Sequence, residues 1–499
     1  MGSVSLTLDG QGLAPALAAS VSAITVRQVF NAPAVALVTF ADPPQREAVP
    51  KIGQTLQVRA PDGTALIDAE VTAVQACLDP GNVRSLHVRA SDRMHRLRKH
   101  QAVRALEGAG LAQLLDQAAS DAGVGSEVIG AAPPTRSLTI QGEESTSDLL
   151  LSAASQAGRY VCLRDGSLRL MTLAGDGDAA ITLTAGENLL QARVENSADP
   201  MRASTLARGW ETGKSELVEN TAGTASQDAI EFRGGDALAA FAGLGKRQLV
   251  GRISANGDEA LALAQADMDR AGALAATFAG LTEGDAGLRP GRVVSLRGLG
   301  DGLDSDYVLT EAEHRFDMVS GYVTQVSTTP PDLPARRAAP GCATLAKVTN
   351  TNDPDKLARV RARLTAYGEV ETGWMPVMAI GAGKDKGICV LPEPGDDVLV
   401  LLPDGDPARG IVLGGLYGPL TPPGQRPGSG ARTFTIRTPA GQVLTLDGAS
   451  KTARIETGQG DVFEMGPKGA RLSVKRDLKI EAPGKTITFG ASQIKFETA

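Results

Sequence analysis

The chain has 499 residues, of which 42% are hydrophobic and 21% charged, so it is long enough for about three or four domains that each bury a core, and a disordered chain is excluded. Its 50 basic and 57 acidic residues give a net charge of −7 without any dense run of lysine and arginine, which argues against non-specific nucleic-acid binding. Glycine (58) outnumbers the aromatic residues (2 Trp, 5 Tyr and 10 Phe), which favours short strands and many turns over long helices.

The first predicted unit, residues 1–105, consists of strands. Apolar and polar residues alternate with period two in segments such as 24–29, 34–40 and 85–89, and turn sequences such as Asp-Pro-Gly-Asn at 79–82 separate these segments. This pattern indicates a small antiparallel barrel or sandwich.

The second predicted unit, residues 106–184, combines two short helices with strands that resume at 159–163. The apolar face of the first helix comprises Leu111, Leu114, Leu115 and Ala118. Gly123 is a suitable residue to end that helix. The second helix begins with a capping box formed by Ser145 and Asp148, and it ends at Gly158. Its apolar face comprises Leu150, Ala153 and Ala157.

The third predicted unit, residues 185–330, returns to strands and contains one more helix at about 258–278. Leu261, Gln265, Met268 and many alanines give this helix a thin apolar face suited to packing on a sheet. The two β-rich units have similar sizes and are candidates for a diverged duplication, although their identity is too low to establish one.

A fourth unit, residues 341–417, lies between two proline-rich linkers. The linkers span 328–340 and 418–428, where the prolines cannot donate to a strand ladder and favour an extended chain. Short strands and turns rich in Gly, Pro and Asp, without a long helix, indicate a compact five-stranded barrel between them.

The last segment, residues 433–499, contains eight pairs of apolar residues, each pair spaced i, i+2. The pairs are Phe434/Ile436, Leu444/Leu446, Ala453/Ile455, Phe463/Met465, Leu472/Val474, Leu478/Ile480, Ile487/Phe489 and Ile494/Phe496. Eight short strands with one apolar face each cannot close a core within one chain of this length. Three chains around one axis would turn every apolar face inward and pair the strand edges.

We therefore predict a trimeric β-prism for residues 433–499. Its predicted core comprises Leu446, Ile455, Met465, Val474, Ile480 and Phe489. The alternative is a monomeric β-meander that caps the preceding barrel.

The four histidines and four cysteines predict no metal or cofactor site. No histidine has a second His or Cys at ligand spacing, and the chain after His314 contains none. The cysteines are Cys77, Cys162, Cys342 and Cys389. They are far apart, form no CxxC pair, and are interpreted as small buried hydrophobic residues. The basic stretch 93–100 is interpreted as a solvated connector, with an interaction patch as the alternative.

Two other motifs are rejected as reaction sites. The segment 209–215 has three residues between Gly and Gly-Lys where a phosphate-binding loop needs four. Carboxylates that could mimic a glycosidase pair lie in turns rich in Pro and Gly, where Asp serves local hydrogen bonds. They are Glu393, Asp396, Asp397, Asp404 and Asp406. We expect no catalytic residue and no cofactor.

No targeting signal is evident. The first nine residues contain no basic region followed by an apolar one, and no run of about 18 apolar residues occurs anywhere. We expect the chain to be made and first folded in the cytoplasm.

The fourth unit resembles a known family. The segments 343–349 and 353–355, the sequence Gly-Asp-Asp-Val-Leu-Val at 395–400 and the sequence Val-Leu-Gly-Gly-Leu-Tyr at 412–417 are similar to the oligonucleotide/oligosaccharide-binding-like (OB-like) barrel of VgrG-type spikes and phage baseplate assembly proteins. Earlier segments resemble the hub domain of tail spikes. They are 186–189, 209–210, 290–291, 298–300, 307–310, His314 and 321–324.

This resemblance implies a mainly β fold with inserted short helices. The implied units are a first hub β-barrel (1–105), a helical insertion (106–184), a second hub β-barrel (185–330), an OB-like spike barrel (341–417) and a C-terminal β-helix or prism (433–499). In this family the protein is a homotrimer at the centre of a contractile injection baseplate, and we expect this chain to be non-enzymatic. Its implied partners are the inner tube protein, baseplate wedge and hub proteins and, only transiently, a target membrane, without nucleic acid.

Departures from the family pattern narrow the resemblance. Arg361 is followed by Ala-Arg-Leu-Thr-Ala-Tyr where secretion-system VgrG proteins carry a Phe-x-Trp-Asp stretch, and no lysozyme-like domain stands between barrel and prism. The similarity therefore favours the spike of an extracellular or phage-tail-like injection system. Type VI secretion VgrG or a contractile phage tail spike is the alternative, and a spike with cell-wall hydrolase activity is a weaker one. At the tip, Ile494 and Phe496 are predicted to bind a cone protein of the PAAR type.

Overall fold

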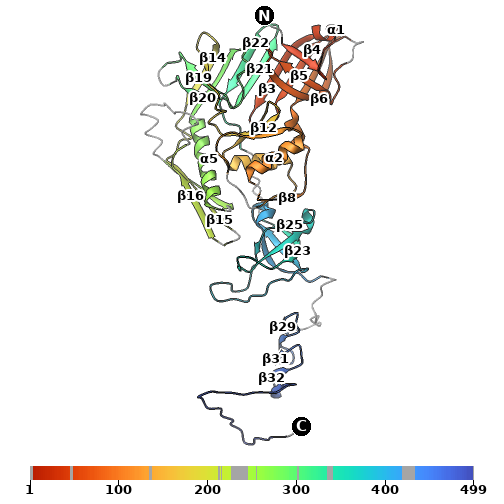
Figure 1. Cartoon of the computed structure of the whole chain (residues 1–499), viewed down its shortest axis with the longest axis vertical. Coiled ribbons are helices and arrows are strands. Elements are labelled where there is room, and N and C mark those ends of the chain that lie inside the picture. Colours follow the sequence, from red (N-terminus) through yellow and green to blue (C-terminus); the bar gives the residue numbers. More distant parts are fainter. Residues whose placement is uncertain are drawn as a thin grey trace. The chain divides into compact units, whose positions relative to one another are not determined.

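The computed structural model describes residues 4–44, 49–108, 110–133, 138–211, 214, 216–225, 245–253, 256–300, 303–333, 341–418 and 433–497. Contacts divide the chain into two compact units, Met1–Leu416 and Tyr417–Ala499 (Figure 1). Of the segments singled out in the sequence, residues 212, 213 and 215 of the glycine-rich loop and residues 334–340 and 419–428 of the linkers lie outside the described part.

Eleven strands of the first unit form one sheet. They are β1 (Ser5–Leu8), β2 (Gln11–Gly12), β3 (Val21–Val29), β4 (Val35–Ala41), β5 (Thr55–Arg59), β6 (Ala65–Asp79), β7 (Val83–Ser91), β14 (Leu189–Asn196), β18 (Ala276–Glu283), β21 (Glu311–Asp317) and β22 (Gly321–Ser327). Their order is β14-β18-β22-β21-β3-β4-β7-β6-β5-β1-β2. A short helix, α1 (Pro15–Ala19), connects β2 to β3.

The two β-rich parts of the hub meet where β21 pairs with β3. This antiparallel pairing runs from Glu311 opposite Val29 to Asp317 opposite Ala23, so strands from both predicted hub barrels belong to one sheet. Phe316 of β21 joins the core that β3 to β7 bury, and it stacks on Tyr322 with ring centroids 4.1 Å apart. Alternate residues of each strand enter this core, as the period-two pattern predicts.

The helical insertion packs against the hub as a separate small core. Its elements are η1 (Arg93–Arg98), β8 (Arg104–Glu107), α2 (Leu111–Ala122), β9 (Gly125–Val128), β10 (Leu138–Gln141), α3 (Thr146–Gln156), β11 (Tyr160–Arg164) and β12 (Ser167–Met171). Both predicted helices are confirmed. Gly123 ends α2 in the left-handed region with φ +72°, and the Ser145 hydroxyl caps α3 by accepting a hydrogen bond from the Asp148 N–H.

The remaining hub elements are two three-stranded sheets, β13-β19-β20 and β16-β15-β17, and a long helix, α5. They are β13 (Ile181–Thr184), β15 (Ser204–Glu211), β16 (Glu216–Ala222), β17 (Lys246–Ile253), α5 (Gly257–Ala275), β19 (Val293–Arg297) and β20 (Asp306–Val308). The helix lies close to its predicted place, and its predicted apolar face is right for Met268 and the alanines but wrong for Leu261. Leu261 is 40% exposed, whereas Ala260, Ala264, Met268 and Ala271 are buried. The alanine stripe allows α5 to lie close to β15 and β16, and Leu261 lies beside that stripe.

The barrel that follows has the predicted set of short strands. Its elements are β23 (Cys342–Asn350), β24 (Arg359–Leu364), η2 (Thr365–Tyr367), β25 (Val370–Glu371), β26 (Met375–Pro376), β27 (Asp397–Leu402), η3 (Pro403–Gly405), η4 (Pro407–Arg409) and β28 (Ile411–Gly415). The strand order is β25-β24-β23-β27-β28, with β26 paired to β24. The prediction of a mainly β fold with inserted helices and an OB-like domain is thus confirmed.

A buried ion pair holds this barrel to the hub. Arg409 of η4 donates to the Glu259 carboxylate in the first turn of α5 at 3.0 Å, and both side chains are almost fully buried. Removing one partner from such a pair leaves an uncompensated buried charge, so the contact fixes the barrel's position on α5.

The second unit is an antiparallel meander. Its strands are β29 (Thr433–Arg437), β30 (Val443–Asp447), β31 (Thr452–Glu456), β32 (Val462–Gly466) and β33 (Gly469–Ser473). Each strand pairs with the next in sequence. Residues 474–497 continue without forming a strand in this single chain. One copy therefore forms five of the eight predicted strands, because a strand is defined by its partner and the last three apolar pairs have none here.

The hub sheet should lose stability in acid through His314. This residue is fully buried in β21, where its Nδ1 lies 3.1 Å from the Tyr322 hydroxyl and 3.2 Å from the Thr324 hydroxyl. Burial lowers the pKa of His314 from 6.5 to about 4. The unfolded chain therefore binds a proton that the folded chain excludes, and about 3 kcal/mol of stability present above pH 6.5 is lost as the pH falls to 4.

We expect His314→Gln to flatten the dependence of the unfolding temperature on pH between 6.5 and 4, measured by circular dichroism. An unchanged slope in His314→Gln would contradict this assignment.

Candidate functional site: the apolar face of the C-terminal meander

Apart from Val443 and Val462, the apolar residues of the five meander strands share one face. The strand register places Phe434, Leu446, Ala453, Met465 and Ala470 in one row across the strands. A second row comprises Ile436, Leu444, Ile455, Phe463 and Leu472. Such cross-strand rows arise because residues spaced i, i+2 point to the same side of a sheet.

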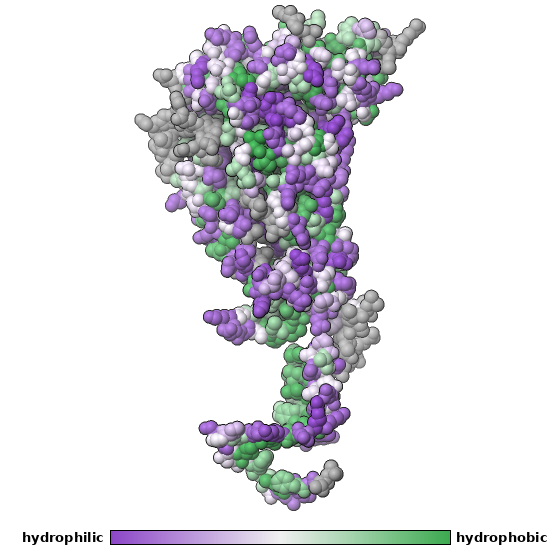
Figure 2. Space-filling view, in the orientation of Figure 1, coloured by the Kyte–Doolittle hydropathy of each residue, from purple (hydrophilic) through white to green (hydrophobic). Residues whose placement is uncertain are grey.

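This apolar face is uncovered. Leu446, Ile455 and Met465 are each about half exposed, and the hydrophobic clusters of the described residues contain no residue from this unit. Figure 2 shows hydrophobic side chains gathered along the C-terminal unit. Contiguous exposed apolar surface of this kind marks a contact with another protein surface.

The opposite face of the meander is mainly polar, with Val443 and Val462 as its apolar residues, and its charged side chains pair with one another. Arg454 in the middle strand lies 2.9 Å from the Glu464 carboxylate and 3.0 Å from the Glu456 carboxylate. Thr435 and Thr445 continue this side. The meander thus has one face suited to water and one suited to burial, which is the asymmetry that the sequence predicts.

The predicted prism-core residues fall into two groups. Leu446, Ile455 and Met465 lie on the apolar face of β30, β31 and β32. Val474 directly follows β33, and the remaining residues lie in the segment without strands. That second group comprises Ile480, Phe489 and the predicted tip residues Ile494 and Phe496. All are exposed in the single chain, Phe496 to 96%.

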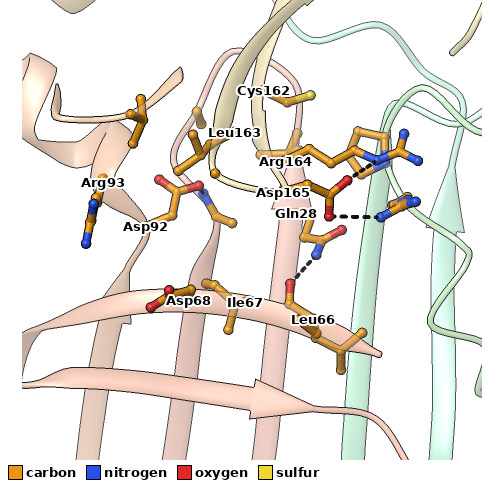
Figure 3. Close-up of a pocket in the computed structure, with 18 of the residues that line it drawn as sticks. Gln28, Leu66, Ile67, Asp68, Asp92, Arg93, Cys162, Leu163, Arg164 and Asp165 are labelled. Carbon is orange, nitrogen blue, oxygen red and sulfur yellow. Dashed lines mark hydrogen bonds and ion pairs between the residues drawn. The ribbon is translucent and has the colours of Figure 1, made fainter. Parts of the chain in front are cut away.

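The hub also contains a small cavity of about 210 Å³ (Figure 3). It lies where β3, β6, the start of η1 and the turn after β11 approach one another. Asp92 on its wall accepts hydrogen bonds from the Ala34 and Met94 N–H groups, yet burial raises the pKa of Asp92 to about 7. Gln28 donates to the Leu66 carbonyl at 2.6 Å. The side chains of Asp92 and Gln28 therefore have a structural role, since each forms hydrogen bonds with backbone groups.

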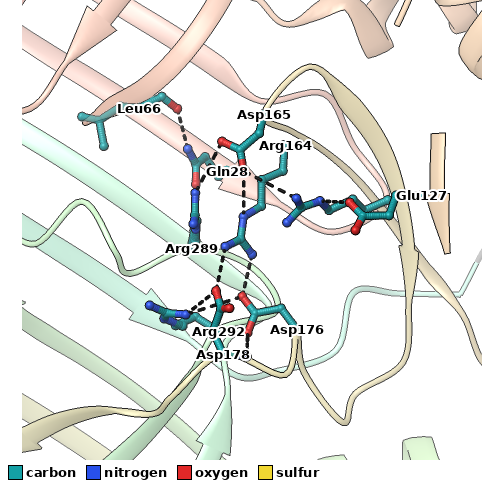
Figure 4. A network of polar contacts seen from close by, with 10 residues as sticks. Gln28, Leu66, Glu127, Arg164, Asp165, Asp176, Asp178, Arg289 and Arg292 are labelled. Atoms are coloured by element: carbon teal, nitrogen blue, oxygen red, sulfur yellow. Dashed lines mark hydrogen bonds and ion pairs between the residues drawn. The ribbon is translucent and has the colours of Figure 1, made fainter. Parts of the chain in front are cut away.

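An arginine–aspartate network adjoins the cavity (Figure 4). Arg164 lies 2.5 Å from the almost fully buried Asp176 carboxylate, and Arg292 lies 2.6 Å from Asp178. Asp165 lies within 4 Å of Arg164 and Arg289. The network ties the helical insertion to the segment before β19. Sequence reasoning missed it because Arg289 and Arg292 are far in sequence from Asp165 and Asp178, and no local pattern pairs them.

The structure corrects the interpretations of the basic stretch 93–100 and of the four cysteines. In the basic stretch, Met94 and Leu97 are buried, and His95 and Arg96 both bind Glu70. The stretch is therefore anchored in the hub through Met94 and Leu97, while Arg93, Arg98 and Lys99 remain exposed. Among the cysteines, Cys162 is buried, Cys77 is half-buried, and Cys342 and Cys389 are exposed. Small size alone did not decide their burial, because both exposed cysteines lie on the outside of the barrel.

The turn assignment of the barrel carboxylates is confirmed for two of them. Asp396 accepts a hydrogen bond from the Glu393 N–H, and Asp406 accepts one from the Ala408 N–H. Arg359 holds Asp353 at 2.7 Å in the first loop of the barrel and keeps the pKa of that carboxyl well below its usual range.

Two features are absent from the described ranges, a metal-binding cluster and a membrane-spanning helix. These ranges contain no group of three or more His, Cys, Asp or Glu side chains arranged to hold a metal ion. No helix there has the length and apolar character needed to cross a membrane.

Residues 344–417 match the family of type VI secretion system/phage-baseplate injector OB domains. A second family, the Alg8 N-terminal domain, matches residues 71–317. That match begins inside β6 and leaves out β1 to β5, so it cuts across the eleven-stranded sheet and supports no assignment. No curated protein matches the chain.

Several solved structures share the fold at low identity. The 43 kDa tail protein of prophage MuSo2 from Shewanella oneidensis is 14% identical, with 65% of this chain and 97% of that chain covered and a TM-score of 0.52. The c3393 protein of E. coli, described as a type VI secretion component similar to the T4 tail proteins gp27 and gp5, is 13% identical over 83% of this chain and 99% of that chain, with a TM-score of 0.54.

A chain of the half-lidded Francisella PdpA-VgrG complex is 8% identical, with 94% of this chain and 87% of that chain covered and a TM-score of 0.55. These likenesses show that the chain has the fold of VgrG and phage tail proteins. Together with the OB-domain match, they confirm the resemblance predicted from the sequence.

The network around Arg164 yields a stability prediction. We expect Arg164→Met to destabilise the first unit by about 3 kcal/mol, because the buried Asp176 carboxylate would lose its 2.5 Å partner. The double variant Arg164→Met/Asp176→Leu should recover most of this loss, since it buries no unpaired charge. Urea unfolding followed by circular dichroism would measure both, and a double variant weaker than the single one would contradict the argument.

Proposed function

We propose that this chain is the central trimeric spike and hub of a contractile injection baseplate, where it joins the inner tube to a tip that punctures the target envelope. The observation that carries this proposal is the uncovered apolar face of the meander in a chain with the fold of VgrG and tail proteins. The hub, the OB barrel and the prism would correspond to residues 1–330, 341–417 and 433–499.

Three copies of the meander can bury its apolar rows, which one copy leaves exposed. Each large apolar side chain gains about 1.5 to 3 kcal/mol when it is fully buried, and the two rows of every copy would meet around a threefold axis. The predicted core residues without strands in one copy, such as Ile480 and Phe489, would find strand partners in the neighbouring copies. The polar face with Arg454 would remain in water.

The hub would contact the inner tube protein and the surrounding baseplate wedge and hub proteins, and the prism would meet a target membrane only transiently. The assembled particle would place the chain in a baseplate and, in an extracellular system, outside the producing cell. We favour the spike of an extracellular phage-tail-like system, on the sequence after Arg361. A type VI secretion VgrG or contractile phage tail spike is the alternative, and purifying the chain with its native particle would distinguish them.

The proposed role is mechanical and non-enzymatic, and it requires neither a cofactor nor nucleic acid. The rival, a spike that also degrades cell wall, predicts a cleared band when the purified chain is run on a peptidoglycan zymogram. We expect no clearing.

The threefold prism predicts that a carboxylate introduced on the apolar face of β30 disrupts the trimer, whereas one introduced on the polar face does not. Leu446→Asp would put three carboxylates into the apolar interior and should convert the trimer to monomers. Thr445→Asp, one residue earlier and beside Arg454, should leave the trimer intact. Light scattering of the full chain measures the mass, which should be three times 51.5 kDa for the wild type. A monomeric wild type would overturn the proposed function.

At the tip, the exposed residues Ile494 and Phe496 of three copies would form an apolar platform for a cone protein of the PAAR type. Ending the chain after Ser492 should abolish retention of that cone protein in a pull-down while the mass stays trimeric. Retained cone binding by the shortened trimer would refute this contact.

A further inference from the structure

A second apolar surface lies on the OB barrel, in the excursion between β26 and β27. All residues from 381 to 390 are exposed, and this arm (residues 377–391) carries four exposed aliphatic side chains. They are Met378, Ile380, Ile388 and Val390. An ordered segment that keeps this much apolar surface outside a core indicates a contact with another protein surface.

The arm is held in one conformation by its own backbone. At its base the Met378 N–H donates to the Val412 carbonyl at 2.8 Å, and farther out the Ile388 N–H donates to the Ile380 carbonyl at 3.0 Å. Gly383 and Lys386 bridge near the tip. Gly387 adopts φ +123°, where a Cβ would lie 3.0 Å from the Ala382 Cα.

This hairpin geometry gathers the aliphatic side chains. The hydrogen bond brings Ile380 and Ile388 together, and Met378 and Val390 lie two residues away from them along the two branches of the arm. The arm thus presents an apolar edge of four exposed aliphatic side chains and ends in a tip with Lys384 and Lys386.

The barrel itself offers a matching surface, which we call the outer strip: Leu345, Leu399, Leu401 and Ile411. These residues alternate with the buried core positions of β23, β27 and β28 and therefore point outward. Leu345 pairs with Leu399, and Leu401 pairs with Ile411, so the strip is continuous across three strands. Leu345 is exposed and the other three are half-buried.

We propose that the arm of one copy docks on the outer strip of the next copy's barrel, so that three barrels close a ring. The four aliphatic side chains of the arm stay exposed within one copy, so the arm does not fill its own strip. The inference rests on the proposed trimer, because only a closed ring lets every arm find a strip without open-ended growth.

Charge supports a second copy as the occupant. The arm carries two lysines and one aspartate, whereas the rest of the barrel, residues 341–376 and 392–417, carries six basic side chains and nine carboxylates. A basic arm tip is therefore attracted to the acidic barrel of a neighbour. Residues 419–432 can extend over at most about 50 Å, so a trimeric prism would also keep the three barrels at high effective concentration.

Hydrogen–deuterium exchange of the full chain, read by mass spectrometry, tests the docking. In the wild-type trimer the amides of residues 377–391 should exchange about tenfold more slowly than in the monomeric Leu446→Asp variant, whose barrel is unaltered. The turn between β6 and β7, residues 79–83, is the internal control and should exchange equally in both. Ile380→Asp should remove the protection of the arm while light scattering still gives a trimer.

The outcomes separate this inference from the proposed function. If the arm of the wild-type trimer exchanges as fast as the arm of Leu446→Asp, no surface protects the arm and the docking is wrong. The proposed spike function would still stand. A wild-type monomer would overturn both. Protection that survives Ile380→Asp would also contradict docking through the apolar edge.

Discussion

The pairing of β21 with β3 is the contact on which the hub depends. It joins strands from the beginning and the end of the hub into one sheet, and the ion pair between Arg27 and Glu311, 2.6 Å apart across the seam, links residues 284 positions apart in sequence. His314 and Phe316 of β21 fill the space beneath the seam. Because the helical insertion and the α5 layer attach to this sheet, their positions follow from that one strand pair.

The two units of the chain follow different rules of stability. The first unit buries several hydrophobic cores and adds buried ion pairs, such as Arg409 with Glu259, where its layers meet. The meander has regular strand pairing but no core of its own. Its stability in isolation is therefore limited to hydrogen bonds and surface ion pairs, which contribute little by themselves. The apolar rows are the part of the molecule that most requires a partner.

Local patterns in the sequence predicted what depends on local physics. The cap of Ser145, the stop at Gly123 and the apolar pairs of the meander depend on neighbouring residues, and each was found. The OB barrel was recognisable because its turn residues occur in a fixed order.

Features that depend on distant contacts could not be read from the sequence. The β21–β3 seam and the Arg292–Asp178 pair join segments without any shared local signal. Leu261 was placed on the buried face of α5 because leucine is more hydrophobic than the alanines that form the face actually buried. The arm and the outer strip were missed for a similar reason: alternation alone cannot tell which side of a strand another surface covers. The two strand systems therefore differ in when their pairings can begin. Each meander strand pairs with its neighbour in sequence, whereas β3 keeps one open edge until residues 311–317 have been synthesised and can pair with it.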